Sequence, residues 1–80
     1  MKDLNKEYYI AFGLHLEKLI ASKGKDVMTV ASLGKIEPKQ VYRALNGEHG
    51  ISMRTILSLA KGLEVQPKEL FDFDFIFDTD

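Results

Sequence analysis

Four long polar side chains stand close together near the middle of the chain, and their types suit hydrogen bonding to nucleic acid. They are Lys39, Gln40, Tyr42 and Arg43. An arginine can donate two hydrogen bonds to a guanine, and a glutamine can bond an adenine in the same way. The apolar residues Val41, Ala44 and Leu45 recur at helical spacing in the same stretch. A short helix here would pack one face inward and present the polar side chains outward.

The sequence gives this short helix a clear start and a clear end. Pro38 suits the first helical position, because its missing N–H needs no partner there. The carboxylate of Glu37 can face the exposed N–H groups at the helix start. Asn46 and Gly47 both tolerate the left-handed conformation that ends helices. We therefore predict a helix over residues 38–45 with the form of a DNA recognition helix.

Further helices are predicted on both sides of this one. Asp26 and Ser52 are good N-cap residues, and Pro67 suits the start of a closing turn. Gly34 offers a left-handed turn residue, with Ile36 as the apolar plug of the turn. The predicted helices cover residues 8–22, 27–33, 38–45, 53–63 and 67–71. Two short helices joined by such a turn make a helix-turn-helix, so the predicted fold class is an all-α, five-helix bundle.

The last ten residues follow a different pattern. Four phenylalanines alternate with Asp72, Asp74, Ile76 and Asp78, and such period-2 alternation is typical of a half-buried strand. We predict that this strand pairs with its copy in a second subunit, so that Phe73, Phe75 and Phe77 form dimer contacts. Two alternatives stay open. The phenylalanines can fold back onto the first and fifth helices, or the end can be frayed.

Composition excludes several classes of protein. The chain has 80 residues and no cysteine, which leaves no disulfide framework and no thiolate metal site. It shows no catalytic or phosphate-binding motif, and His15 has no other metal ligand at suitable spacing. We expect no catalytic site, no metal and no cofactor. No apolar stretch reaches the roughly 18 residues of a membrane span, and no secretory segment opens the chain, so we expect a cytoplasmic protein.

Charge gives only weak support to DNA binding. The net charge is −1, but the last ten residues carry four aspartates, at positions 72, 74, 78 and 80, and no basic residue. Residues 1–70 carry 11 basic and 8 acidic side chains, a net charge of +3. The field at the contact face matters more than the total charge, and this balance predicts modest affinity.

A set of residues spread over about sixty positions keeps the spacing of a known family. The set comprises Phe12, Gly13, Leu16, Leu19, Gly24, Val30, Ala31, Ile36, Val41, Asn46, Gly47, Ile51, Ser52, Thr55, Ile56, Leu59, Ala60, Leu63, Val65, Glu69, Leu70 and Phe71. In this pattern the chain resembles the phage-repressor-like (Xre-type) helix-turn-helix DNA-binding domains. The resemblance implies a five-helix bundle that binds operator DNA, usually as a dimer, with the third helix in the major groove. We expect an N-terminal arm at 1–7, the DNA-binding domain at 8–71 and a tail at 72–80.

Some departures from the family concern the fold. The family often has a buried pair formed by an arginine late in the first helix and a glutamate just before the Asn-Gly. Here these positions are Ile20 and Leu45, so both charged residues are replaced by apolar ones. Such a double replacement is often neutral or stabilising. Lys25 stands where an apolar residue is common, and Lys35 stands where the turn glycine is usual.

The resemblance also assigns contacts by position. Base contacts fall to Pro38, Lys39 and Arg43, with Gln40 and Tyr42 beside them. Backbone contacts fall to Lys35, Asn46, His49 and Arg54. Two departures oppose DNA binding: Val27 replaces a glutamine that contacts the DNA backbone, and Glu37 replaces serine or threonine near the phosphates. The simpler interpretation of each polar residue is a solvated side chain on an exposed helix.

We therefore expect a homodimeric, sequence-specific regulator of transcription on double-stranded DNA, acting as a repressor by occluding a promoter. Two copies of helix 38–45 would lie about 34–36 Å apart on a pseudo-palindromic site. The alternative is a protein-interaction module on the same fold, or an antitoxin whose apolar tail binds a toxin. The glutamine lost at Val27, the negative charge of Glu37 and the acidic tail favour the alternative. The outward Lys39, Gln40 and Arg43 oppose it.

Overall fold

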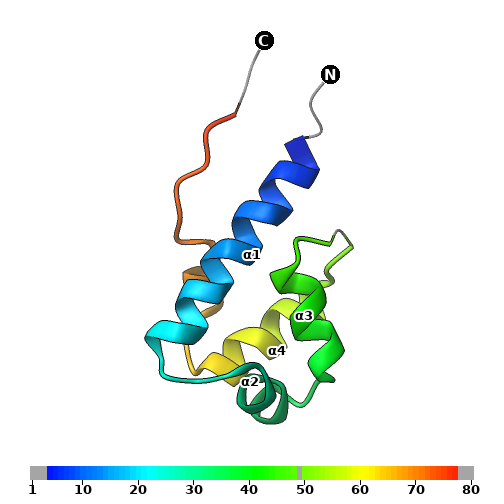
Figure 1. Ribbon diagram of the computed structural model, residues 1–80, viewed down its shortest axis with the longest axis vertical. Coiled ribbons are helices and arrows are strands. Elements are labelled where there is room, and N and C mark those ends of the chain that lie inside the picture. Colours follow the sequence, from blue (N-terminus) through cyan, green and yellow to red (C-terminus); the bar gives the residue numbers. More distant parts are fainter. Residues whose placement is uncertain (1–3, 49, 78–80) are drawn as a thin grey trace.

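The computed structural model describes residues 4–48 and 50–77, and this part of the chain is all-α (Figure 1). The α-helices are α1 (Leu4–Ser22), α2 (Val27–Gly34), α3 (Pro38–Leu45) and α4 (Met53–Leu63), and a 3-10 helix, η1, covers Pro67–Phe71. Helices α2, α3 and α4 lie together at one end of the molecule. The start of α1 and the segment after η1 extend to the other end (Figure 1).

Local signals place the helix ends where the sequence predicts them. Asp26 Oδ1 accepts a hydrogen bond from the Thr29 N–H at 2.8 Å, and Ser52 Oγ accepts one from the Thr55 N–H at 3.2 Å. One difference is the start of α1 at Leu4, so that residues 4–7 of the expected arm are helical. In the described part of the chain, Glu37 takes the N-cap position of α3 without a side-chain capping bond.

The core contains apolar side chains from all five helical elements. The largest fully buried ones are Leu16, Val30, Val41, Leu59, Leu63 and Leu70. Ile36 packs against this core from the turn between α2 and α3, as predicted. The core therefore holds the two helices of the helix-turn-helix against α1 and α4.

Two glycines allow α2 and α4 to approach closely. A Cβ atom on Gly34 would overlap the carbonyl oxygen of Ser58, and one on Gly62 would overlap that of Val30. Gly34 is thus the last helical residue of α2, and the left-handed position falls on Lys35, with φ 58°. The prediction that Gly34 is the left-handed residue was wrong, because helix packing requires the glycine one place earlier.

Lys35→Gly should raise the free energy of unfolding by about 0.5–1 kcal/mol, because a left-handed backbone costs a residue with a Cβ about 1–2 kcal/mol. Urea denaturation measures the change. Lys35→Ala is the control, since it removes the same charge and keeps the strained conformation. Equal stability of the two variants would contradict the assignment of strain to this position.

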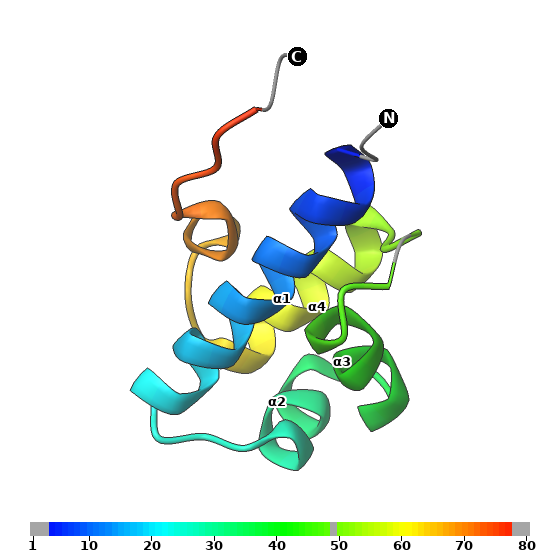
Figure 2. The same ribbon diagram turned by 45° about the horizontal axis from the view of Figure 1, so that its top comes forward.

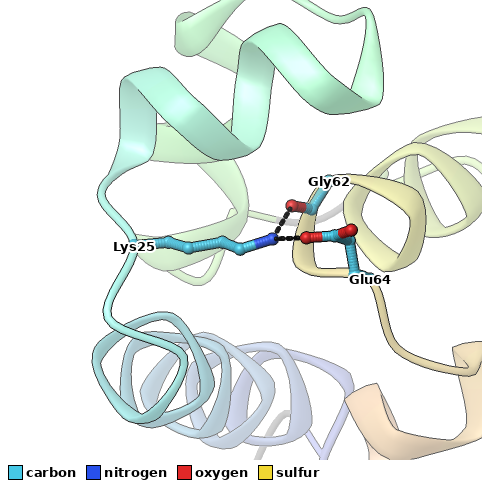
Figure 3. A network of polar contacts seen from close by, with 3 residues as sticks. All are labelled: Lys25, Gly62 and Glu64. Atoms are coloured by element: carbon cyan, nitrogen blue, oxygen red, sulfur yellow. Dashed lines mark hydrogen bonds and ion pairs between the residues drawn. The ribbon is translucent and has the colours of Figure 1, made fainter.

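Lys25 ties the loop between α1 and α2 to the end of α4 (Figure 3). Its Nζ donates to the Gly62 carbonyl oxygen at 3.1 Å and to Glu64 Oε1 at 2.6 Å. A cation at a helix C-terminus also complements the helix dipole. The site where the family commonly has an apolar residue is therefore used for an ion pair, with the Lys25 side chain 15% exposed.

Two carboxylates link stability to pH. The hydrogen bond from Lys25 holds the pKa of Glu64 below its ordinary value of 4.5, and the Thr29 N–H holds the pKa of Asp26 below 3.8. Each group stabilises the fold above its ordinary pKa, and this contribution is lost as pH falls through the lower value of the folded state. The melting temperature should fall below about pH 4.5, and less steeply in Glu64→Gln and Asp26→Asn. Unchanged slopes in both variants would contradict this origin.

The predicted strand is absent from residues 72–77, and the fold-back alternative is the one that the structure shows. The ring centroid of Phe73 lies 5.2 Å from Tyr8 and 5.1 Å from His15, and Phe75 meets Tyr8 edge-on at 4.8 Å. In this alternating segment α1 of the same chain partly covers Phe73 and Phe75, whereas Phe71 and Phe77 stay 43% and 63% exposed. Figure 2 shows η1 and this segment beside α1, away from α3.

The fifth helix is also shorter and tighter than a bundle helix. Residues 67–71 form a 3-10 helix in place of the fifth α-helix that we expected. His15 is partly buried beside it, with Nε2 2.8 Å from the Glu69 carbonyl oxygen. Among the described residues, no cluster of side chains could hold a metal ion, and no helix is long and apolar enough to cross a membrane.

Candidate nucleic-acid interface

The turn between α2 and α3 is fixed by backbone hydrogen bonds and by one apolar side chain. The N–H groups of Lys35 and Ile36 donate to the carbonyl oxygens of Ser32 and Ala31 at 3.3 and 3.1 Å. Ile36 then packs on the core, and α3 begins at Pro38. The angle between the two helices is thus set by contacts inside the domain.

Helix α3 lies against α1 at very short range. A Cβ atom on Gly13 would come within 2.8 Å of the Ala44 carbonyl oxygen and would overlap that of Leu45. The inward residues Val41 and Ala44 are fully buried. This contact fixes the outward face of α3, which carries Lys39 and Arg43 into solvent.

A hollow of about 390 Å³ between α3 and the start of α4 brings three of the predicted residues together. Gln40 and Arg43 enter it from α3, and Arg54 enters it from α4. The other predicted contacts lie outside its lining: Pro38 is partly buried, and Lys35, Lys39, Tyr42 and Asn46 are exposed. His49, predicted as a backbone contact, lies outside the described residues.

Arg43 has a partner that the sequence did not suggest. Its Nε donates to Glu48 Oε1 at 3.1 Å, and both side chains are about half exposed. The signal that could have found this partner is Asn46-Gly47. A left-handed Gly47, with φ 73°, folds the chain back so that the Glu48 N–H donates to the Arg43 carbonyl oxygen at 3.1 Å.

Charges in the hollow nearly cancel. Arg43 and Arg54 share it with the carboxylates of Glu37 and Glu48. Phosphate groups would meet no strong positive field here, so sequence-independent affinity is expected to be low. This arrangement suits hydrogen bonding to bases better than binding by charge alone.

Comparison with known proteins assigns the family. Residues 15–75 match the family described as the Cro/C1-type HTH DNA-binding domain. The chain belongs to this family. This assignment confirms the resemblance found in the sequence and makes DNA binding in transcription regulation the function class of the chain.

One solved structure shares the arrangement of this Cro/C1-type domain. It is the restriction-modification controller protein C.AhdI from Aeromonas hydrophila, with 32% sequence identity and a TM-score of 0.75. The similarity covers 81% of this chain and 98% of that chain. None of the curated proteins compared matches the chain.

Proposed function

We propose that this protein is a homodimeric transcription regulator that binds one specific double-stranded DNA sequence with α3 in the major groove. The observation that carries the proposal is the exposed polar face of α3, fixed against α1 by Gly13, in a chain of a DNA-binding family. The likeness to a restriction-modification controller protein supports a regulator over the interaction module. The comparisons give no support to a toxin as partner.

The proposed contacts divide by their place on the surface. Arg43 and Gln40 would read bases from the hollow, and Lys39 would reach bases from the exposed first turn of α3. Pro38 and Tyr42 are proposed as further base contacts beside these three residues. Lys35, Asn46 and Arg54 would hold phosphates, which fix the register and carry no sequence information.

Selection from a random duplex pool at low and moderate salt tests the function. Enrichment of a two-fold symmetric motif is the expected result, and binding that selects no motif and vanishes with salt would refute it. Repression through promoter occlusion is the proposed mode. A reporter carrying the selected site in its promoter should give less transcript when the protein is present, and an increase would refute repression.

The proposed dimer contact lies at the end of the molecule away from α2. An open, mainly apolar groove of about 740 Å³ lies between α1, the start of α4 and the tail. At the end of the described tail, Ile76 and Phe77 leave 89% and 63% of their surface exposed, although the ring of Phe77 meets that of Phe75 edge-on at 5.2 Å. A second copy would cover these side chains without the strand pairing that the sequence predicted.

Replacing Ile76 and Phe77 together by aspartate should convert the dimer to monomers, because two charges would have to be buried at the contact. Sedimentation equilibrium measures the mass. Met28→Asp is the matched control, since Met28 is also 63% exposed but lies on α2 at the other end. An unchanged dimer in the double variant would remove the tail from the interface.

A further inference from the structure

Glu48 is joined to Arg43 at two points. The backbone N–H of Glu48 donates to the Arg43 carbonyl oxygen at 3.1 Å, and the Arg43 Nε donates to Glu48 Oε1 at 3.1 Å. The first bond, together with that from the Gly47 N–H to the Ala44 carbonyl oxygen at 3.2 Å, makes a Schellman end to α3. The carboxylate is therefore placed by the same backbone that carries the arginine.

The helix end that places Glu48 is itself held by α1. Gly47 has a φ of 73°, and a Cβ atom there would come within 2.9 Å of the Ile10 Cα. The residue must therefore be glycine both for its conformation and for its contact. Because Gly47 packs against α1, the backbone position of Glu48 is fixed relative to α1.

The ion pair leaves the arginine able to read a base. A guanidinium group has five N–H donors, and Nε supplies only one of them to Glu48. Two of the remaining donors are enough for the O6 and N7 atoms of a guanine. A long side chain that is already held in place also loses less freedom on binding. The Glu48 carboxylate also lowers affinity for DNA, since its negative charge lies in the same hollow as Arg54, a proposed phosphate contact.

We propose that Glu48 is a positioning residue for Arg43. It holds the guanidinium group in the orientation that reads a base, and it raises sequence discrimination while it lowers affinity for DNA in general. The inference rests on the proposed function, because it takes Arg43 as a base-reading residue.

Three variants in one binding assay test the role of Glu48. The probes are the selected site, the same site with the base pair read by Arg43 exchanged, and a random duplex. Glu48→Ala should reduce discrimination at that base pair about twofold to tenfold, the range expected when a long side chain is no longer held. Glu48→Gln should keep most of it, because its amide oxygen can still accept from Nε. Both should bind the random duplex more tightly than the parent, since a negative charge is removed.

Glu37→Gln is the matched control. Glu37 lines the same hollow, and within the described residues the structure shows no ion pair between it and Arg43. Its replacement should raise affinity for all duplexes and leave the base preference unchanged. A loss of discrimination as large as that of Glu48→Ala would overturn the proposal, because charge alone would then explain the effect.

A second background separates positioning from a general structural role. In Arg43→Ala, the further change Glu48→Ala should cause no additional loss of discrimination, and such a loss would overturn the proposal. If the parent selects no motif, the proposed function and this inference fall together. If Arg43→Ala reduces the preference at one base pair and Glu48→Ala does not, only the positioning role of Glu48 is refuted.

Discussion

Ile20→Arg should lower the free energy of unfolding by about 3–5 kcal/mol, the cost of a buried charge without a partner. Ile20 is 7% exposed and belongs to the core. By the family resemblance, this position is often an arginine paired with a glutamate, and that second position is Leu45 here. Here Ile20 belongs to the core and Leu45 packs against it, so a charge introduced at position 20 alone should be strongly destabilising.

The double variant Ile20→Arg with Leu45→Glu should recover about half or more of this loss, since the paired charges would compensate each other. The backbone of Leu45 lies beside Gly13, which precedes Ile20 by two turns of α1. Side chains on a helix lean toward its N-terminus, so an arginine at position 20 would extend toward Leu45.

Thermal and urea unfolding of the two variants and the parent give the coupling energy. Ile20→Leu is the control for packing and should cost less than about 1.5 kcal/mol. If the double variant is no more stable than Ile20→Arg alone, the two positions do not meet, and the exchange of ion pair for apolar pair would lose its structural basis.

Local signals in the sequence were enough to predict most of the fold. The caps at Asp26 and Ser52 and the limits of the helix at Pro38 and Gly47 depend on bonds within a few residues. Such bonds form wherever the segment folds, so the sequence alone predicts them. The polar face of α3 follows directly from these limits.

Features that depend on distant contacts escaped prediction. The alternating phenylalanines predict one buried side but not the surface that buries it, which is α1 through Tyr8 and His15. From the sequence alone Gly34 is predicted to be a turn residue, because nothing local shows that the carbonyl oxygen of Ser58 packs against it. The pair of Arg43 and Glu48 differs, because it is local: the left-handed Gly47 folds Glu48 back toward Arg43, and Asn46-Gly47 is the signal that could have found it.

Arg43→Ala should abolish preference at one base pair of each half-site and weaken binding to the selected duplex. A bidentate contact to guanine contributes about 1–3 kcal/mol of discrimination, or about 5-fold to 150-fold. Affinity for a random duplex should fall less, since only the general attraction of one positive charge is lost there. The fold should be unaffected, because an exposed ion pair contributes about 0–1 kcal/mol.

Arg54→Ala is the decisive comparison, because it removes the same side chain from the other wall of the hollow. As a proposed phosphate contact, Arg54 should contribute to binding of every sequence alike, and its loss should reduce the dependence of affinity on salt by about one ion. Competition binding against single-base variants of the site distinguishes the two arginines. If both variants weaken binding to all duplexes equally, Arg43 reads no base and contributes only its charge. A base preference lost in Arg43→Ala and kept in Arg54→Ala would place sequence reading on α3.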